Sequence, residues 1–407
     1  MHIERLIAHR ILFADKKENR ISRPVVRIAT AGIVLGTAVM IIAISVVGGF
    51  KHEIREKLIG FNAHVQISKF DGNISQESAP FALDSSMVKQ LRAIPGVKHV
   101  RSVATKAGIL KKNEEIQGVV AKGVGPDYNW GYFSDNLVEG EVMKLSKYQK
   151  TDKILLSKWL ASRLDVHAGD SVNMFFIQQP PRARRFKIAG IYDTGFEEFY
   201  KLYIFCYIEH LRKLNDWKDD EIGGLEVMVD DFKGLESTTE AIYESINSEL
   251  DARSVKETYP QLFDWLALQD INALIIIALM MAVSGINMIA ALLVIMLERV
   301  RMIGTLKALG ATDDSIRKVF LWVSAFIIGR GMVVGNLIGI GLVLIQQLFH
   351  PIPLDVSSYY VPYVPVKLDL FNIIFLASGT FLLCLFMMLL PARWIGKVRP
   401  ATSLRYD

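Results

Sequence analysis

The chain has 407 residues, a length that allows two or three domains. Hydrophobic residues make up 51% of it and the mean hydropathy of +0.28 is high for a soluble protein, whereas the formal net charge of +5 is small. Two cysteines are too few for a disulfide-linked scaffold. The apolar residues gather towards the two ends of the chain and the middle has a soluble composition, so we expect a membrane protein with a folded extramembrane domain.

Four stretches are long and apolar enough to cross a bilayer as helices, which takes about 20 residues each. They are residues 28–50, 271–297, 314–349 and 370–390. The first, second and fourth contain no charged residue, and from residue 319 onwards the third contains only Arg330. The first stretch is too long for the hydrophobic region of a signal peptide and no small-residue cleavage site follows it, so we expect it to remain as an anchor.

Lys and Arg residues predict the side of the membrane on which each connection lies, because they are enriched in cytoplasmic segments. They are dense before the first span, between the second and third spans and after the fourth, whereas residues 350–369 contain a single one, Lys367. The segments expected in the cytoplasm are 1–27, 298–313 and 391–407, and those expected on the opposite side are 51–270 and 350–369.

Residues 51–270 are long enough for a compact domain. Strand patterns occur at 64–68, 116–124, 184–192 and 224–229, and helical patterns at 85–94, 153–164 and 235–250. Strands and helices mix without strict alternation, which predicts an α+β domain between the first and second membrane helices. The helical patterns of residues 51–58 and 263–270 predict two stalks that continue those membrane helices.

Residues 173–190 show two strand-like runs around a short segment with two prolines. The simpler interpretation is a hairpin with a stiff tip. The alternative is a protruding hairpin that binds a partner, because prolines prevent hydrogen bonding at an exposed edge and arginines surround the tip. The residues expected to serve such binding are Phe175, Phe176, Gln179, Pro180, Pro181, Arg182 and Arg185, together with Ile177 and Arg184.

Several catalytic motifs are missing from the sequence. It contains no phosphate-binding G-x-x-x-x-G-K-[ST] loop, no H-E-x-x-H, no cysteine pair at zinc spacing and no G-x-S-x-G. We therefore expect no catalytic residue, no metal site and no cofactor in this chain.

Arg330 is the one charge in the third predicted span from residue 319 onwards, and an arginine at the bilayer centre costs about 2.5–3.5 kcal/mol on insertion scales. It can extend towards the inner leaflet, or it can pair within an assembly or with a lipid phosphate. Glycines follow it at a spacing of four, at Gly331, Gly335 and Gly339, and the first span repeats this spacing at Gly32 and Gly36. Small residues at this spacing favour close helix packing.

The connection between the second and third spans carries the pattern of a short amphipathic helix. Val300, Met302, Ile303, Leu306 and Leu309 form an apolar stripe. Gly310 is placed as a helix stop, and Thr312 or Asp313 can cap the next helix. The pattern alone fits equally a helix that rests on lipid and one that contacts a partner.

The same connection, "ERVRMIGTLKALGAT" (298–312), resembles the signature "ER-x-R-E-I-G-x-L-K-A-L-G-A" of the FtsX-like permease family of ABC transporters, with Met302 in place of the usual acidic residue. The tail "PARWIGKVRPATSLRYD" (391–407) resembles the closing motif of that family. The resemblance implies a coupling helix that docks into a separate ATPase subunit, which would bind ATP and Mg. The residues implied in coupling are Glu298, Arg299, Met302, Ile303, Gly304, Leu306, Lys307, Leu309 and Gly310.

Residues 7–67 resemble the lipoprotein-releasing Lol permeases, with "GIVLG" in the first span and "GFNAHV" after it. This resemblance implies a multi-pass protein of the bacterial inner membrane with a periplasmic domain. It also implies release of lipoproteins from the outer leaflet to a periplasmic carrier, an ATPase partner, and a second permease that is either another copy or a homologue. The hairpin at 173–190 lies where one permease type of that system has a carrier-binding hook.

For the lipid chains of a lipoprotein we expect a path along the outer half of the first span, where Met40, Ile44, Val47 and Phe50 share roughly one helical face. Two alternatives to lipoprotein release stay open. Related permeases transduce signals that activate a cell-wall hydrolase, and others belong to macrolide-efflux exporters.

Overall fold

The structure, a computed structural model, describes residues 3–13, 22–70, 77–146 and 151–389. The chain divides into two compact units. The first contains Met1–His52, Trp265–Pro353 and Tyr363–Asp407, and the second contains Glu53–Asp264 and Leu354–Pro362. The cytoplasmic tail expected at residues 391–407 lies outside the described residues.

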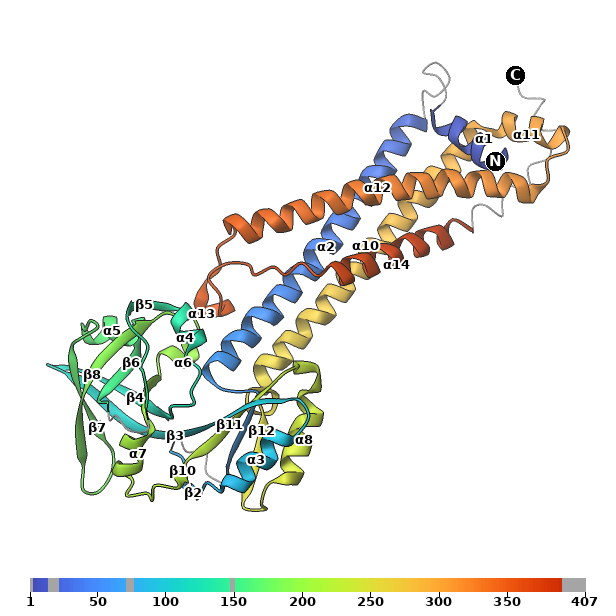
Figure 1. The fold of residues 1–407 in the computed structure, drawn as a ribbon. Helices are drawn as coiled ribbons and strands as arrows, with labels where there is room; N and C mark the ends of the chain where they lie inside the picture. Colours follow the sequence, from blue (N-terminus) through green and yellow to red (C-terminus); the bar gives the residue numbers. More distant parts are fainter. Residues whose placement is uncertain (1–2, 14–21, 71–76, 147–150, 390–407) are drawn as a thin grey trace. The chain divides into compact units, whose positions relative to one another are not determined.

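Long helices dominate the first unit (Figure 1). Four of the described helices are long and apolar enough to cross a membrane, and each overlaps one of the predicted spans. They are α2 (Ser22–Phe61), α10 (Pro260–Glu298), α12 (Asp313–Phe349) and α14 (Leu370–Met387). Two shorter helices, α1 (Ile3–Phe13) and α11 (Val300–Ala308), accompany them.

α2 and α10 are uninterrupted helices of 40 and 39 residues, so the helical patterns at 51–58 and 263–270 do continue the membrane helices. Pro24 and Pro260 lie in the first turns of the two helices, where the missing N–H of proline is tolerated, and no later proline interrupts either helix. At about 1.5 Å per residue, each helix is roughly twice as long as the hydrocarbon core of a bilayer is thick.

Glycines bring α12 close to α2, as their spacing of four predicts. A Cβ atom at Gly331 would lie 3.0 Å from Cγ2 of Ile33, and one at Gly335 would overlap the hydroxyl of Thr37. The row continues at Gly339, where a Cβ would again lie against the backbone of α2. Any side chain in this row would push the two helices apart.

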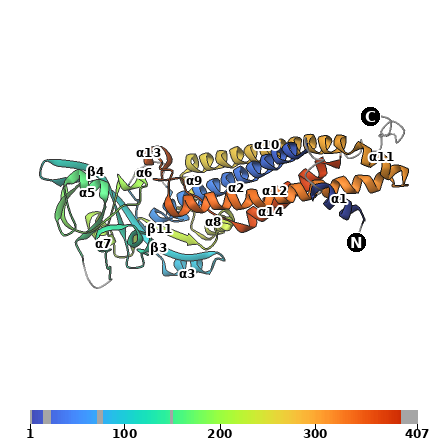
Figure 2. The same cartoon turned by 90° about the horizontal axis from the view of Figure 1, so that it is seen from above.

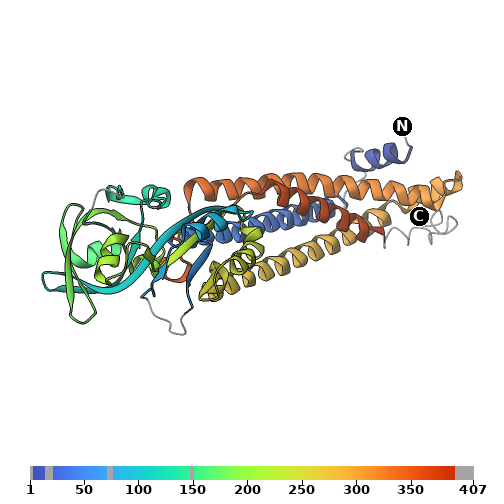
Figure 3. The same ribbon diagram turned by 60° about the horizontal axis from the view of Figure 1, so that its bottom comes forward.

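A cluster of buried apolar residues joins α1, α2, α10, α11, α12 and α14 within the first unit. Figure 2 shows the long helices of this unit as one bundle. α12 contributes more residues to the cluster than any other helix, including the fully buried Phe320. α1 lies beside α12 (Figure 3), where Ser315 donates a hydrogen bond of 2.9 Å to Glu4. The sequence did not predict α1 as a helix, although Ile7 and Ile11 are spaced by four and Ala8 is buried.

Within the described residues, the second unit contains a ten-stranded mixed sheet with the order β12–β1–β11–β3–β4–β9–β6–β8–β5. β7 pairs with both β3 and β8, so the pairings β3–β4–β9–β6–β8–β7–β3 close into a ring. Closure leaves these strands without free edges. The strands are β1 (Val65–Lys69), β3 (Val97–Lys112), β4 (Glu115–Val124), β5 (Leu137–Gly140), β6 (Lys153–Ser157), β7 (Ser171–Phe176), β8 (Arg182–Tyr192), β9 (Tyr203–Tyr207), β11 (Gly224–Val229) and β12 (Leu250–Ser254).

Short helices accompany these strands, and β2 (Phe81–Ala82) pairs with β10 (Glu221–Ile222) apart from the main sheet. The helices are α3 (Ser85–Ala93), α4 (Gly131–Asp135), α5 (Lys158–Leu164), α6 (Glu197–Tyr200), α7 (Ile208–Leu214), the 3₁₀ helix η1 (Phe232–Gly234), α8 (Leu235–Ser245), α9 (Val255–Thr258) and α13 (Val356–Tyr359).

Two predicted helices of this unit have different bounds in the structure. Residues 153–164 form β6 and then α5, because Ile154, Leu155 and Leu156 are buried in the sheet and the Ser157 side chain caps the helix by accepting from the Leu160 N–H. The helix predicted at 235–250 ends at Ser245, and Leu250 begins β12.

Candidate functional site

α11 is separated from α10 by a single residue and ends in a Schellman motif. The N–H of Ala311 bonds to the carbonyl of Leu306, and the N–H of Gly310 bonds to the carbonyl of Lys307. Gly310 has a φ of +92°, which only glycine adopts without strain. Thr312 then caps α12 by accepting from the Ser315 N–H, as the sequence predicts.

Lys307 ties the end of α11 to the start of α12. Its ammonium lies 2.7 Å from Oδ1 of Asp313, and only 10% of the Lys307 side chain is exposed. Two of the last carbonyls of α11 are also bonded in the Schellman turn, so hydrogen bonds and an ion pair together hold the α11–α12 corner.

The residues of the apolar stripe predicted on α11 differ in how deeply they are buried. Ile303 and Gly304 are buried, and Ile303 belongs to the cluster of the helical bundle. Met302 and Leu306 are half-buried, whereas Leu309 is 80% exposed. Of the remaining residues implied in coupling, Glu298 is exposed at the end of α10 and Arg299 is half-buried at the start of α11.

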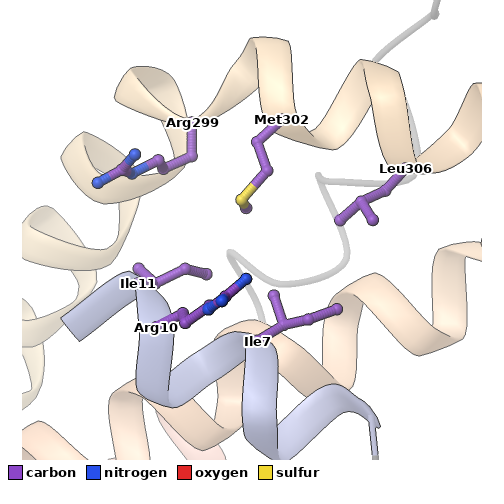
Figure 4. A pocket seen from close by; sticks show the side chains of 6 residues that line it. All are labelled: Ile7, Arg10, Ile11, Arg299, Met302 and Leu306. Carbon is purple, nitrogen blue, oxygen red and sulfur yellow. The ribbon is translucent and has the colours of Figure 1, made fainter. Parts of the chain in front are cut away.

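A cavity of about 240 Å³ lies between α1 and α11. Figure 4 shows Met302 and Leu306 of α11 on one side of it, facing α1. The residues of α1 that line it are Ile7, Arg10 and Ile11, and Arg299 completes the lining. α1 thus covers part of the apolar stripe of α11, which the sequence pattern alone assigned equally to lipid or to a partner.

The predicted hairpin is present as β7 and β8, which pair in register from Ser171–Lys187 to Phe176–Arg182. Alternation along β7 buries Met174 and Phe176 and exposes Phe175. The tip follows at residues 177–181, where the Gln179–Pro180 peptide is cis and Gln179, Pro180 and Pro181 are exposed.

Two residues expected at the binding surface of the hairpin have other roles in the structure. Phe176 is 1% exposed, so it belongs to the core, whereas the other two expected apolar residues, Phe175 and Ile177, are 42% and 68% exposed. Arg182 makes a bidentate ion pair with Asp216, at 2.8 and 3.1 Å, and donates to the carbonyl of Leu214. It therefore fixes the hairpin to the end of α7, whereas Arg185 is exposed on β8.

The end of α2 is bonded to the sheet of the second unit by two buried cations. Lys122 of β4 donates to the carbonyl of Phe61 over 2.6 Å, and Arg101 of β3 donates to the carbonyl of Asn62. Both also pair with Glu226 of β11, at 2.5 and 2.7 Å. Burial alone would raise the pKa of the Glu226 carboxyl, but the charges of Lys122 and Arg101 hold it below its ordinary value.

Phe61 itself is buried in an aromatic core. Its ring centroid lies 5.4 Å from those of Phe133 and Phe199 and 5.9 Å from that of Tyr192. The polar bonds to its carbonyl and the packing of its ring together fix the end of α2 in position and in rotation.

His64 lies three residues after the end of α2 and is buried. Its Nδ1 accepts a hydrogen bond of 3.2 Å from the Val229 N–H. Burial and the nearby cations of Arg55, Arg101 and Lys98 lower the pKa of His64 to about 4, so the imidazole is neutral at pH 7. The sequence pointed to none of these buried charged residues, because polar residues spaced along separate strands give no local signal.

The four residues expected along one face of the first span do not share one environment. Ile44, Val47 and Phe50 are half-buried, but Met40 is 1% exposed. Met40 lies one turn after Gly36, where a Cβ would lie 2.5 Å from Ser284 of α10. Met40 is therefore inaccessible to a lipid chain on the expected path, because the helical bundle covers that face of α2.

Arg330 of α12 is exposed and lines a groove between α2 and α12. Among the described residues, no group of three or more His, Cys, Asp and Glu side chains could hold a metal ion. The contacts described above join the helices to one another and the end of α2 to the sheet, through close packing, hydrogen bonds and ion pairs.

Two parts of the sequence match known families. Residues 28–244, more than half of the chain, match the MacB-like periplasmic core domain, and residues 274–400 match the FtsX-like permease C-terminal family. The chain belongs to the FtsX-like and MacB-like family of ABC transporter permeases. Such permeases are the non-catalytic components of their transporters.

Curated relatives match nearly the full length. Lipoprotein-releasing system transmembrane protein LolC of Neisseria meningitidis serogroup B is 26% identical over 415 residues, and the match covers 96% of each chain. The LolE protein of the same system from Haemophilus influenzae is 22% identical over 424 residues, again with 96% of each chain covered. Among solved structures, the periplasmic region of MacB from Actinobacillus actinomycetemcomitans is similar, with a TM-score of 0.35, 15% identity, and coverage of 51% of this chain and 95% of that chain.

Proposed function

We propose that this chain is the permease subunit of an ABC transporter that releases lipoproteins from the outer leaflet of the inner membrane to a periplasmic carrier. The observation that carries the proposal is the end-to-end similarity to LolC and LolE proteins, at 26% and 22% identity over 96% of each chain. The proposal places both termini and α11 in the cytoplasm and the second unit in the periplasm, because Lys and Arg are dense in the former segments.

ATP hydrolysis is assigned to a separate subunit, which would bind ATP and Mg and dock on α11. The exposed Leu309 is the apolar side chain of α11 best placed for that docking, since Ile303 is buried within the chain. α11 is joined to α12 by the Lys307–Asp313 ion pair and to α10 through a single residue. Movement of α11 would therefore act on two membrane helices together.

α2 and α10 are proposed to carry that movement to the periplasmic unit. α2 reaches the sheet as one unbroken helix, and its last carbonyls are held by Lys122 and Arg101. Near the start of α10, Tyr259 accepts a hydrogen bond of 3.1 Å from Asn62, so the end of α2 and the entry to α10 are linked within the second unit. The two helices are thus joined to each other where α2 meets the sheet.

A lipoprotein must bring its acyl chains out of hydrocarbon, at about 0.8 kcal/mol for each CH₂ exposed to water. Three chains make unassisted release negligible, so an apolar path is needed. We assign this path to the outer half of α2, at Ile44, Val47 and Phe50, which remain partly exposed in the single chain. The pairing of two permeases, as identical copies or as homologues, would enclose it.

The β7–β8 hairpin is assigned to the carrier. Phe175 and Ile177 present an exposed apolar surface beside Pro180 and Pro181, and Arg185 adds a positive charge. Exposed aromatic and aliphatic side chains on a stiff support suit a protein-binding site, because little conformational entropy is lost on binding.

The experiment that tests the function is reconstitution of the chain with its ATPase in liposomes that contain a triacylated lipoprotein. ATP-dependent appearance of the lipoprotein on a soluble acceptor would support lipoprotein release. ATP hydrolysis without transfer, in the presence of acceptor and a second permease, would contradict it.

A further inference from the structure

A groove of about 770 Å³ lies between α2 and α12 within the first unit. This volume falls in the range of roughly 300–1,000 Å³ that is usual for ligand sites. The residues that line it are apolar apart from Thr30 and two arginines, Arg27 of α2 and Arg330 of α12, and none of them is acidic. The groove thus combines a strongly positive end with an apolar wall.

Both arginines are exposed, and neither has a hydrogen-bond or ion-pair partner among the described residues. The other polar side chain in the lining, that of Thr30, donates its hydroxyl hydrogen bond to the carbonyl of Val26. Two guanidinium groups at one groove therefore retain their full capacity to bind an anion.

The uncharged segments that follow the two arginines place them at one edge of the membrane. After Arg330, α12 has 19 uncharged residues (331–349), or about 28 Å, and after Arg27, α2 has 23 (28–50), or about 34 Å. Both lengths are close to the roughly 30 Å of a hydrocarbon core. The two helices also pack in register here, since Gly331 lies against Thr30 and Ile33.

We propose that this groove binds an anionic phospholipid, whose phosphate is held by Arg27 and Arg330. Arginine forms paired hydrogen bonds with phosphate oxygens, and the two side chains reach the site from different helices. One acyl chain of the lipid lies along Val34, Leu35 and Val334, which continue the groove away from the arginines into the apolar span.

Two features favour a phospholipid over a soluble anion. The positive end of the groove opens at the level of lipid headgroups, and its wall offers an apolar surface that free phosphate would not use. An anionic headgroup is favoured over a zwitterionic one because two cations and no acidic residue surround it. The existence of the site does not depend on the proposed orientation of the chain, but the leaflet does. With that orientation, the lipid lies in the cytoplasmic leaflet, where anionic lipids attract basic residues.

Lipid binding tests this proposal without any need for lipoprotein transport. The full chain, purified in a neutral detergent, is titrated in native mass spectrometry with phosphatidylglycerol or with phosphatidylcholine of the same acyl chains. Phosphatidylglycerol is expected to bind about tenfold more tightly. Arg27→Gln and Arg330→Gln are each expected to weaken its binding about tenfold, whereas Arg317→Gln, which removes an equal charge from the same helix, should leave it unchanged.

A second variant keeps the test decisive where an arginine variant fails to fold. Ala31 is exposed in the groove, so Ala31→Trp should fill it and abolish lipid binding with both arginines in place. Equal binding of the two lipids, or full binding by the Arg27 and Arg330 variants, would overturn the proposal. So would displacement of the lipid by millimolar inorganic phosphate, or a disulfide between Leu35→Cys residues of two copies in native membranes, which would show that a second permease fills the groove.

Discussion

The ammonium group of Lys122 donates a hydrogen bond of 2.6 Å to the carbonyl oxygen of Phe61, the last residue of α2. Helix ends leave carbonyls without intrahelical partners, and most are satisfied by water or by a turn. Here a buried lysine takes that role and is itself neutralised by Glu226 at 2.5 Å. The Glu226 carboxylate thus balances both cations that bond the end of α2 to the sheet, Lys122 and Arg101.

Glu226→Ala should destabilise the periplasmic unit by about 3–5 kcal/mol, because it leaves Arg101 and Lys122 buried without a counter-charge. Denaturant unfolding of the full chain in detergent, followed by circular dichroism, measures this loss. Glu240→Ala removes an exposed glutamate from α8 and should change the free energy of unfolding by less than about 0.5 kcal/mol. A loss below about 1 kcal/mol for Glu226→Ala would show that the two cations find other partners.

Acidification should destabilise the same unit through His64. Its pKa is about 4 in the folded state, below the ordinary value of 6.5, so the unfolded chain binds the proton more strongly between these values. The stabilisation is complete above pH 6.5 and is lost as the pH falls towards 4, by about 3 kcal/mol in total. The amide of His64→Gln can accept from Val229 but cannot be protonated, so unfolding of this variant should depend less on pH in that window. Identical pH profiles would refute the assignment.

Close packing of α12 on α2 predicts that Gly335→Ala is costly. The added methyl group would overlap the hydroxyl of Thr37, at a cost of about 1–3 kcal/mol. Thermal unfolding of the purified chain measures this effect. Gly341→Ala, on the same helix with open space around it, is the matched control. The double variant with Gly335→Ala and Thr37→Ala should be more stable than the sum of the two single effects predicts. If the two losses of stability simply add, the strain does not arise from the contact with Thr37.

For α11, Leu309→Asp should reduce stimulation of the partner ATPase at least about tenfold while the free energy of unfolding stays within about 0.5 kcal/mol, because Leu309 is exposed and outside the bundle. ATPase assays on the reconstituted complex measure it. Ile303→Asp is the contrasting variant, since it introduces a charge into the buried cluster and should unfold the bundle. Normal stimulation by Leu309→Asp would remove α11 from the ATPase interface.

For the hairpin, the double variant Phe175→Asp and Ile177→Asp should abolish capture of the carrier without weakening the fold. A pull-down of the carrier by the detergent-solubilised chain measures this. Val138→Asp, at a side chain on β5 that is 56% exposed, controls for added charge. Phe176→Ala should instead destabilise the unit by about 3–5 kcal/mol, because it opens a cavity in the core. Undiminished capture by the double variant would assign this surface to another role.

The features that depend on the spacing of neighbouring residues were predictable from the sequence. The four apolar helices, the continuation of α2 and α10, the Gly310 stop and the Thr312 cap each follow from local spacing. The α2–α12 contact was also predictable, because glycines at a spacing of four expose backbone on one face of a helix.

What the sequence did not reveal depends on residues that are distant along the chain. Arg101, Lys122 and Glu226 lie on three different strands, and only the pairing of β3 with both β4 and β11 brings them together. The ring closed by β7 is hidden for the same reason. Phe176 was misassigned because an apolar run carries no mark of which alternate residues face the core, and Met40 because the helix that covers its face lies more than 200 residues away.

The unbroken helical ladder of α2 sets a limit on how this protein can vary. Each helical residue turns the chain by about 100° and advances it by 1.5 Å. Within the second unit, one residue inserted or deleted between the buried Ile54 and Leu58 would turn Ile54 about 100° out of register with Phe61, so these side chains could not all stay buried. Amino acids in this stretch can be exchanged, but their number cannot change, so relatives that share the attachment at Phe61 should align here without gaps.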